Sequence, residues 1–380
     1  VGRYTEGKLS AARARVEKNM VRALFEGSKD RERALGAIHY VEGFFADTLP
    51  GPVRRLSILR CDSDLYVSTL ETLERLYPKL SVGGYVVFDA LTAEEADAAV
   101  GKFWDHVEGL GSGVDRGDAS TWTDDRWPPG VGATGILPWF NVGHSDLQWF
   151  VRTRPRVAAA FRAVWRAAAD EPMVASFDGC CAWRPGAATA DGWLHVDQDA
   201  RRGGGFEMVQ GLVALTDVVE GGGGNVLVAG SHRSVFPRLL EAFGPELAAN
   251  GGDDYFELPR PDPICERDAV CCLLRKGDLL LWDSRLVHAS TPRHSADPPP
   301  ADELARCCSF QCMVPARLCP PEVRAARRAA FEDGVTTSHW PTKLVRTDGY
   351  DSFRELPAAV RLRFAEPPSV PWTPDIGALL

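Results

Sequence analysis

The sequence predicts an α+β protein in which a β-sandwich or jelly roll with flanking helices follows a partial, Rossmann-like α/β unit. Two observations lead to this prediction. Between residues 175 and 315 the chain consists of short apolar runs separated by Gly-rich turns, as in sandwiches and jelly rolls. Before residue 110, a strand, a helix and a second strand follow one another at the spacing of a βαβ unit.

Length and composition set limits on the class of protein. The chain has 380 residues, enough for two domains, with 45% hydrophobic and 25% charged residues, as in ordinary soluble proteins. A net charge of −9 argues against nucleic acid or an anionic membrane as partner. No apolar run approaches the roughly 20 residues that span a bilayer, and the first residues do not resemble a signal peptide. Because the chain begins with Val1, we expect a fragment or a processed product.

The ten cysteines include three adjacent pairs, at 180–181, 271–272 and 307–308. Neighbouring residues of a strand face opposite ways, so each pair is expected to place one thiol on each side of its strand. No C-x-x-C spacing occurs, which argues against zinc. We therefore expect reduced thiols and a cytoplasmic location.

The first predicted unit covers residues 1–110. Ser10 is placed to cap a helix over 10–26, and strands are expected at 56–61 and 85–89 on either side of a helix over 68–80. The order strand, helix, strand predicts a piece of parallel sheet.

Three segments of this unit, at 43–50, 59–69 and 76–85, resemble the macrocin-type (TylF-like) O-methyltransferases over about residues 17–110. The resemblance implies S-adenosylmethionine and a metal site, and Asp62, Asp64 and Asp89 are the candidate Mg²⁺ ligands. The family's Gly-rich cofactor loop would lie upstream of this sequence, and its acidic pair is reduced here to Asp89 and Ala90. We therefore expect a half-domain that serves as a packing or interaction surface. A degenerate metal-dependent O-methyltransferase is an alternative.

A segment rich in Gly, Asp, Ser, Thr and Pro predicts a linker over 111–135, and a second domain over 136–380. Two helices are expected at its start, one capped by Ser145 and one beginning at Pro155. Further helices are expected at 321–332 and 353–364, with a solvated arginine face on the first and an extended strap from 367. The strands of this domain are expected at 176–183, around 195, and at 207–217, 225–233, 269–274, 279–288 and 306–313.

His195 and Asp197 lie two residues apart in one of these strands. Alternate strand residues share a face, so both side chains can reach one metal ion. With a second histidine they form a 2-His-1-carboxylate set, which is typical of non-haem Fe(II) oxygenases. An isolated H-x-D is common by chance, and a hydrogen-bonded surface pair is the alternative.

The order of motifs after residue 136 resembles the phytanoyl-CoA-dioxygenase-like Fe(II)/2-oxoglutarate oxygenases over about residues 136–320. After the H-x-D strand come an L-x-D strand end, a Gly-Ser-His turn, a Gly-Asp turn, a second histidine and an arginine that opens the last strand. In this sequence these are His195 and Asp197, 215–217, 230–232, 277–278, His288 and Arg306. The resemblance implies a double-stranded β-helix.

The same resemblance implies that His195, Asp197 and His288 bind Fe(II), with O₂ and 2-oxoglutarate at the open positions. It also implies that 2-oxoglutarate is decarboxylated to succinate while a small organic molecule is oxidised. Arg306 is the candidate anchor of the far carboxylate, with Arg293 as its rival. Gln210 is a further candidate facing the co-substrate.

The other histidines are weighed against structural roles. His288 is alternatively a buried core histidine, and His232 is expected to hold a loop. The remaining ones, His39, His106, His144, His294 and His339, have no partner spacing and are expected to be ordinary. The rival to an oxygenase is a non-catalytic metal-binding or scaffold protein on the same fold. The sequence leaves the substrate and the oligomeric state open.

Overall fold

The structure is a computed structural model that describes residues 60–61, 83–251, 253–265, 269–292, 300–364 and 370–380. All of these lie in one compact unit, Leu49–Leu380. Residues Val1–Thr48 form a second unit, outside the described residues. The predicted helix over 10–26 falls there. The helix over 68–80 is also outside the described residues.

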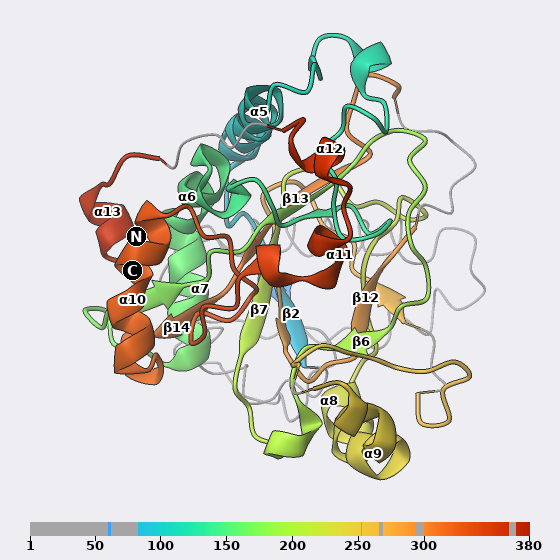
Figure 1. Cartoon of the computed structure of the whole chain (residues 1–380). Coiled ribbons are helices and arrows are strands. Elements are labelled where there is room, and N and C mark those ends of the chain that lie inside the picture. Colours follow the sequence, from blue (N-terminus) through green and yellow to red (C-terminus); the bar gives the residue numbers. More distant parts are fainter. Residues whose placement is uncertain (1–59, 62–82, 252, 266–268, 293–299, 365–369) are drawn as a thin grey trace, which may run out of the picture. The chain divides into compact units, whose positions relative to one another are not determined.

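Two β-sheets form the centre of the described unit (Figure 1). The larger has seven strands in the order β1 (Arg60–Cys61), β2 (Gly84–Val87), β11 (Leu279–Asp283), β7 (Val209–Ala214), β13 (Arg306–Gln311), β5 (Cys180–Trp183) and β3 (Ile136–Leu137). The smaller has five, in the order β10 (Val270–Cys271), β8 (Gly224–Leu227), β12 (His288–Thr291), β6 (His195–Val196) and β9 (Phe256–Glu257). A separate pair joins β14 (Met313–Pro315) and β4 (Met173–Ala175).

Helices flank the two sheets (Figure 1). They are α5 (Ala93–Gly109), α6 (Asp146–Arg152), α7 (Pro155–Trp165), α8 (Ser231–Ser234), α9 (Leu239–Ala249), α10 (Pro321–Glu332), α11 (Asp351–Arg354), α12 (Ala358–Arg361) and α13 (Pro374–Gly377). None of the helices that the structure describes is long and apolar enough to cross a membrane.

Strand alternation divides the apolar residues of the larger sheet between two cores. On β11, Leu279 and Leu281 pack into the cluster beneath α5, α6 and α7, whereas Leu280 and Trp282 pack into the cluster between the sheets. The adjacent cysteines follow the same rule, since Cys180 joins the first cluster and Cys181 the second. The predicted alternation of thiols is confirmed there, and the described cysteines are free.

Several predicted helices are confirmed in detail. Ser145 caps α6 through a bond from the Gln148 N–H to its Oγ, 3.4 Å long. Pro155 opens α7, whose Val157, Phe161 and Val164 are buried against the larger sheet. Because the predicted apolar stripe becomes a packing face, α7 needs no further role.

Other predictions about elements were wrong. His288 does not end the strand that begins at Leu279; the chain turns at 284–287 and His288 opens β12 in the other sheet. The helix expected over 353–364 is divided into α11 and α12 by Pro357, which cannot continue a helix. Arg327 on α10 is buried, where Nε donates to the Leu380 carbonyl oxygen at 2.8 Å. The expected strap from 367 contains α13, and Ile376 is part of the core.

The strand β2, which the sequence assigned to the first unit, joins the larger sheet of the second. It pairs in parallel with β1, as the βαβ pattern predicted, and antiparallel with β11 of the larger sheet. Helix α5 follows it, and Trp104 of α5 packs on Trp122 at 4.7 Å between ring centroids, within the segment predicted as a linker. The larger sheet thus extends into residues that the sequence assigned to the N-terminal unit. The rest of the predicted Rossmann-like unit lies outside the described residues, and the domain boundaries stay a prediction.

Candidate functional site

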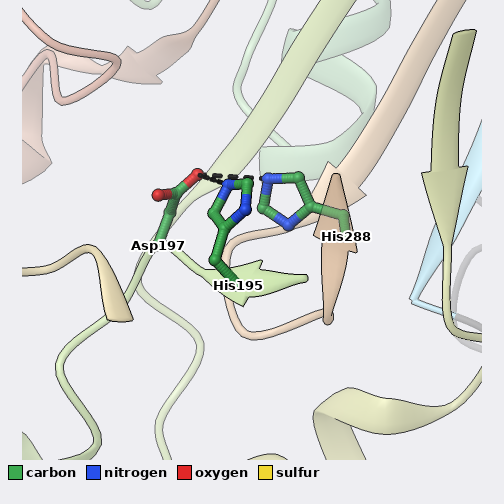
Figure 2. A group of neighbouring side chains, drawn as sticks. All are labelled: His195, Asp197 and His288. Atoms are coloured by element: carbon green, nitrogen blue, oxygen red, sulfur yellow. Dashed lines mark ion pairs between the residues drawn. The ribbon is translucent and has the colours of Figure 1, made fainter. Parts of the chain in front are cut away.

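Three side chains from the smaller sheet converge between the two sheets (Figure 2). His195 on β6 lies directly opposite His288 on β12, and Asp197 follows β6 immediately. Asp197 Oδ2 is 3.6 Å from His195 Nε2 and 3.2 Å from His288 Nε2. All three side chains are buried, and their possible ligand atoms lie within 4.8 Å of one another.

Local backbone carbonyls fix both histidine rings. His195 Nδ1 lies 2.9 Å from the Trp193 oxygen, and His288 Nδ1 lies 2.8 Å from the Leu286 oxygen. A carbonyl oxygen only accepts, so each Nδ1 carries the hydrogen and each Nε2 presents its lone pair. The Trp193 ring also stacks on His195 at 4.7 Å, with 10° between the planes.

Asp197 is held through both its backbone and its side chain. Its N–H donates to the Ser284 carbonyl at 3.0 Å, and Gln210 Nε2 donates to Oδ2 at 2.8 Å. Burial acts to raise the pKa of Asp197, but the neighbouring His195 and His339 outweigh it and hold that pKa well below its usual value. Burial and His195 lower the pKa of His288.

The three candidate ligand atoms can therefore all act as electron-pair donors to a metal ion. When both rings are neutral with their hydrogen on Nδ1, two ring nitrogens with lone pairs and an anionic oxygen point at one another, and none supplies a hydrogen to the others. Such a convergence is stabilised by a cation, and the ligand types suit a first-row metal such as Fe(II).

Unpartnered donors lie on the His288 side of this group. Arg306 on β13 is buried and donates through Nη1 to Ser290 Oγ at 2.9 Å, while its Nε has no partner among the described residues. Ser290 follows His288 by two residues on β12, and its register partner on β8 is Asn225, whose Nδ2 is also buried without a described partner. The same holds for Nε1 of Trp282, whose ring lies 5.2 Å from that of His288.

Acceptors gather on the Asp197 side. The Thr337 N–H donates to the Phe177 carbonyl at 2.9 Å, so the segment that carries His339 runs beside the segment that carries Asp178. His339 Nε2 is buried without a described partner. Burial raises the pKa of Asp178 to about 6, although His339 acts in the opposite direction.

A second chain of contacts places the same segment beside the histidine ligand. Lys343, four residues after His339, pairs with Asp254. Tyr255 follows Asp254, and the centroid of its ring lies 4.8 Å from that of the His195 ring. The segment 337–343 therefore borders the group on one side.

The structure brings together most of the predicted site residues. His195, Asp197 and His288 meet directly, Gln210 bonds to Asp197, and Arg306 reaches the His288 strand through Ser290. The rival Arg293 lies outside the described residues.

The predicted magnesium ligands are not assembled by the described structure. Asp62 and Asp64 lie outside the described residues. Asp89 is exposed, and its Oδ1 lies 3.7 Å from Arg275 Nη2.

Sequence reasoning missed Asp178, His339, Asn225 and Trp282. His339 was set aside because no histidine or carboxylate stands near it in sequence, and its neighbours come from a distant loop. Strand alternation could have indicated Asn225 and Trp282. Asn225 lies at an inward-facing position of the smaller sheet, and Trp282 at one of the larger sheet.

The turn motifs that carry the oxygenase resemblance, at 215–217, 230–232 and 277–278, have side-chain oxygens that accept hydrogen bonds from backbone N–H groups of other loops. Asp217 Oδ1 accepts from the Lys276 N–H at 2.7 Å, and Ser231 Oγ accepts from the Val287 N–H at 2.7 Å. Asp278 accepts from the Asp89 N–H at 3.1 Å. These bonds fix the turns on either side of β11, and so the approach of His288 to the site.

Comparison with known families gives two matches. The phytanoyl-CoA dioxygenase (PhyH) model matches residues 84–300, more than half of the chain. The macrocin-O-methyltransferase (TylF) model matches residues 6–121. Both resemblances expected from the sequence are confirmed, but the first begins earlier than expected, at β2, and ends before Arg306.

Individual relatives match different shares of the chain. Ava biosynthesis cluster protein O of Aspergillus versicolor is 26% identical over 281 residues, which is 69% of this chain and 84% of that protein. The demethyldecarbamoylnovobiocin O-methyltransferase of Streptomyces niveus is 55% identical over only 53 residues, 14% of this chain and 20% of that enzyme. The fold resembles that of the hypothetical protein JW0805 from Escherichia coli, with a TM-score of 0.50 and 15% identity over 94% of this chain and 93% of that one.

Replacing Asp178 by Asn is expected to stabilise the protein at pH 7.5, by roughly 2 °C in melting temperature. The folded-state pKa of about 6 lies above that of an unfolded Asp, about 3.9. Wild-type stability therefore falls as the pH rises from about 4 to 6 and stays lower above that window. The gain from Asp178→Asn is thus smaller at pH 5.0 than at pH 7.5.

Thermal melts at the two pH values check this, with the exposed Asp302→Asn as the control that changes neither. Equal gains at both pH values, or a loss at pH 7.5, contradict the assignment.

Proposed function

The chain belongs to the phytanoyl-CoA dioxygenase family of Fe(II)/2-oxoglutarate-dependent oxygenases, and from this premise we propose that it oxidises a small organic molecule at an iron bound by His195, Asp197 and His288. One observation supports this most strongly, the convergence of three buried acceptor atoms from β6 and β12.

The residues fit the metal that the family implies. His195, Asp197 and His288 would hold the ion and would leave part of its coordination shell to the co-substrate and O₂. When bound, the iron supplies O₂ activation coupled to decarboxylation of 2-oxoglutarate to succinate. The chain itself fixes the rings of His195 and His288 and keeps the ligand atoms out of water.

The donor side fits 2-oxoglutarate. Its carboxylates and oxo group only accept hydrogen bonds, and Arg306, Asn225 and Trp282 offer buried donors without a described partner. A guanidinium binds a carboxylate through two parallel bonds, so we assign the far carboxylate to Arg306, with Ser290 beside it. Gln210 uses one hydrogen of its amide NH₂ on Asp197, so we assign this residue to the metal ligand rather than to the co-substrate.

The acceptor side indicates the substrate class. The Asp178 carboxylate offers an acceptor on this side, and His339 Nε2 offers a second when its ring is neutral with the hydrogen on Nδ1. We infer a substrate that carries a hydroxyl or amine hydrogen near the carbon that is oxidised.

Removing a metal ligand is expected to abolish both metal binding and turnover. Wild-type protein binds one Fe(II) and forms succinate from 2-oxoglutarate under O₂, whereas His195→Ala and Asp197→Ala do neither. Metal analysis after dialysis and succinate chromatography measure this, with His106→Gln as a control at a histidine outside the site. Succinate formation that survives in both alanine variants overturns the ligand assignment.

Arg306→Leu is expected to raise the KM for 2-oxoglutarate by about 30-fold or more, since losing one partner of a buried charged contact costs about 2–5 kcal/mol. Arg306→Lys retains the charge but lacks the paired N–H donors of the guanidinium, so it is expected to give an intermediate KM for 2-oxoglutarate. Metal affinity stays at the wild-type level in both.

Arg293→Leu is the matched comparison and is expected to leave the KM unchanged. The reverse pattern, with Arg306→Leu silent and Arg293→Leu impaired, makes Arg293 the anchor.

A screen of paired compounds tests the substrate class. Each hydroxyl compound is compared with its O-methyl derivative, which lacks the O–H, and the readout is succinate above the substrate-free rate. The free compound is expected to stimulate and its derivative not to. Asp178→Asn and His339→Gln are expected to raise the KM for the active compound about tenfold, as for a lost hydrogen bond of roughly 1–3 kcal/mol. Equal stimulation by both members of each active pair contradicts the inference.

A further inference from the structure

The three candidate metal ligands are held in two different ways. Each histidine bonds through Nδ1 to the carbonyl two residues before it, at Trp193 and Leu286. These bonds are local and form wherever the strand backbone forms. The Asp197 carboxylate instead depends on Gln210, which comes from β7 in the opposite sheet.

The hydrogen bond reaches the oxygen that faces both histidines. Asp197 Oδ2 accepts from Gln210 Nε2 at 2.8 Å and lies 3.2 Å from His288 Nε2. A carboxylate oxygen has two lone pairs, so one can accept from the amide while the other points at a metal. The bond therefore orients the carboxylate without competing for it.

The chemistry of the amide fixes its direction. An ionised carboxylate only accepts, so the NH₂ group of Gln210 must face Asp197 and its carbonyl must face away. That Oε1 is buried without a partner among the described residues.

The backbone of Gln210 is rigid. It lies on β7, which is hydrogen-bonded on both sides, to β11 and to β13, with Trp282 as the register partner of Gln210. Asp197, by contrast, follows the two-residue strand β6. A central strand thus holds the side chain of a ligand whose backbone lies just beyond a two-residue strand.

We propose that Gln210 is a positioning residue for the metal site, holding the Asp197 carboxylate from the opposite sheet so that it completes the ligand set with the two histidines. The proposal rests on the proposed metal-binding function. Outer partners of metal ligands typically contribute 10–100-fold to affinity.

The test is Co(II) binding by the metal-free full chain, followed by calorimetry and by the visible absorption bands of the ion. Gln210→Met retains length and burial but removes the donor, and its Kd is expected to rise about 10–100-fold with altered absorption bands. Gln210→Asn retains the amide but shortens the reach by about 1.5 Å, and a rise in Kd is expected there too. If Gln210→Met fails to fold, Gln210→Asn decides the question.

Gln311→Met is the matched control. Gln311 is also fully buried on a central strand of the same sheet, and its Oε1 is also unpartnered among the described residues, but its Nε2 donates to Gln148 at 2.8 Å. It belongs to a network with Ser309 and α6, away from the three ligands. Gln311→Met is expected to leave the Co(II) affinity within about threefold of wild type.

The outcomes separate this proposal from the function on which it rests. If wild-type protein binds no Co(II), the metal-site function fails. If wild type and Gln210→Met bind with equal affinity and the same absorption bands, the function stands and the positioning role is overturned. An equal loss in Gln210→Met and Gln311→Met also overturns it, because it reports general loss of packing.

Discussion

The pairing of β6 with β12 is the constraint on which the site depends. It sets His195 directly opposite His288, so two residues far apart in sequence become neighbours on one face of the smaller sheet. The turn at 284–287 makes this possible, because it moves the chain from the larger sheet to the smaller one just before His288. Ser284 in that turn also accepts the Asp197 N–H, so the same turn fixes the third ligand.

Around that pairing, hydrogen-bond donors lie on the His288 side of the three ligands and acceptors lie on the Asp197 side. Donors without described partners lie near His288, on strands β8, β11 and β13. Acceptors lie near Asp197, in the loops that carry Asp178 and His339. Since an anionic co-substrate needs donors, and a hydroxyl or amine needs acceptors, the separation gives each side of the three-ligand group a different ligand chemistry. Burial strengthens this discrimination, because an unmatched polar group in a dry site is costly.

The N-terminal match has a different physical meaning from the oxygenase match. The two family models overlap on residues 84–121, where β2 and α5 lie. There β2 pairs with β1 on one side and with β11 on the other, so a strand of methyltransferase-like sequence is part of the larger sheet. Edge strands offer unpaired backbone groups, and β1 covers that edge of β2. This agrees with the packing role expected of a partial methyltransferase segment.

The sequence by itself determined the local features: the helices at α6, α7 and α10, the alternation of Cys180 and Cys181, and the H-x-D spacing. Each follows from strand or helix periodicity or from a capping residue, which need no distant partner. Ordered motifs added His288 and Arg306 as candidates. Only the tertiary structure decided that His288 faces His195 across a strand pair, that Gln210 holds Asp197, and that His339 borders the site. These depend on register and on contacts between distant segments, and no local pattern encodes which sheet a strand joins after a turn.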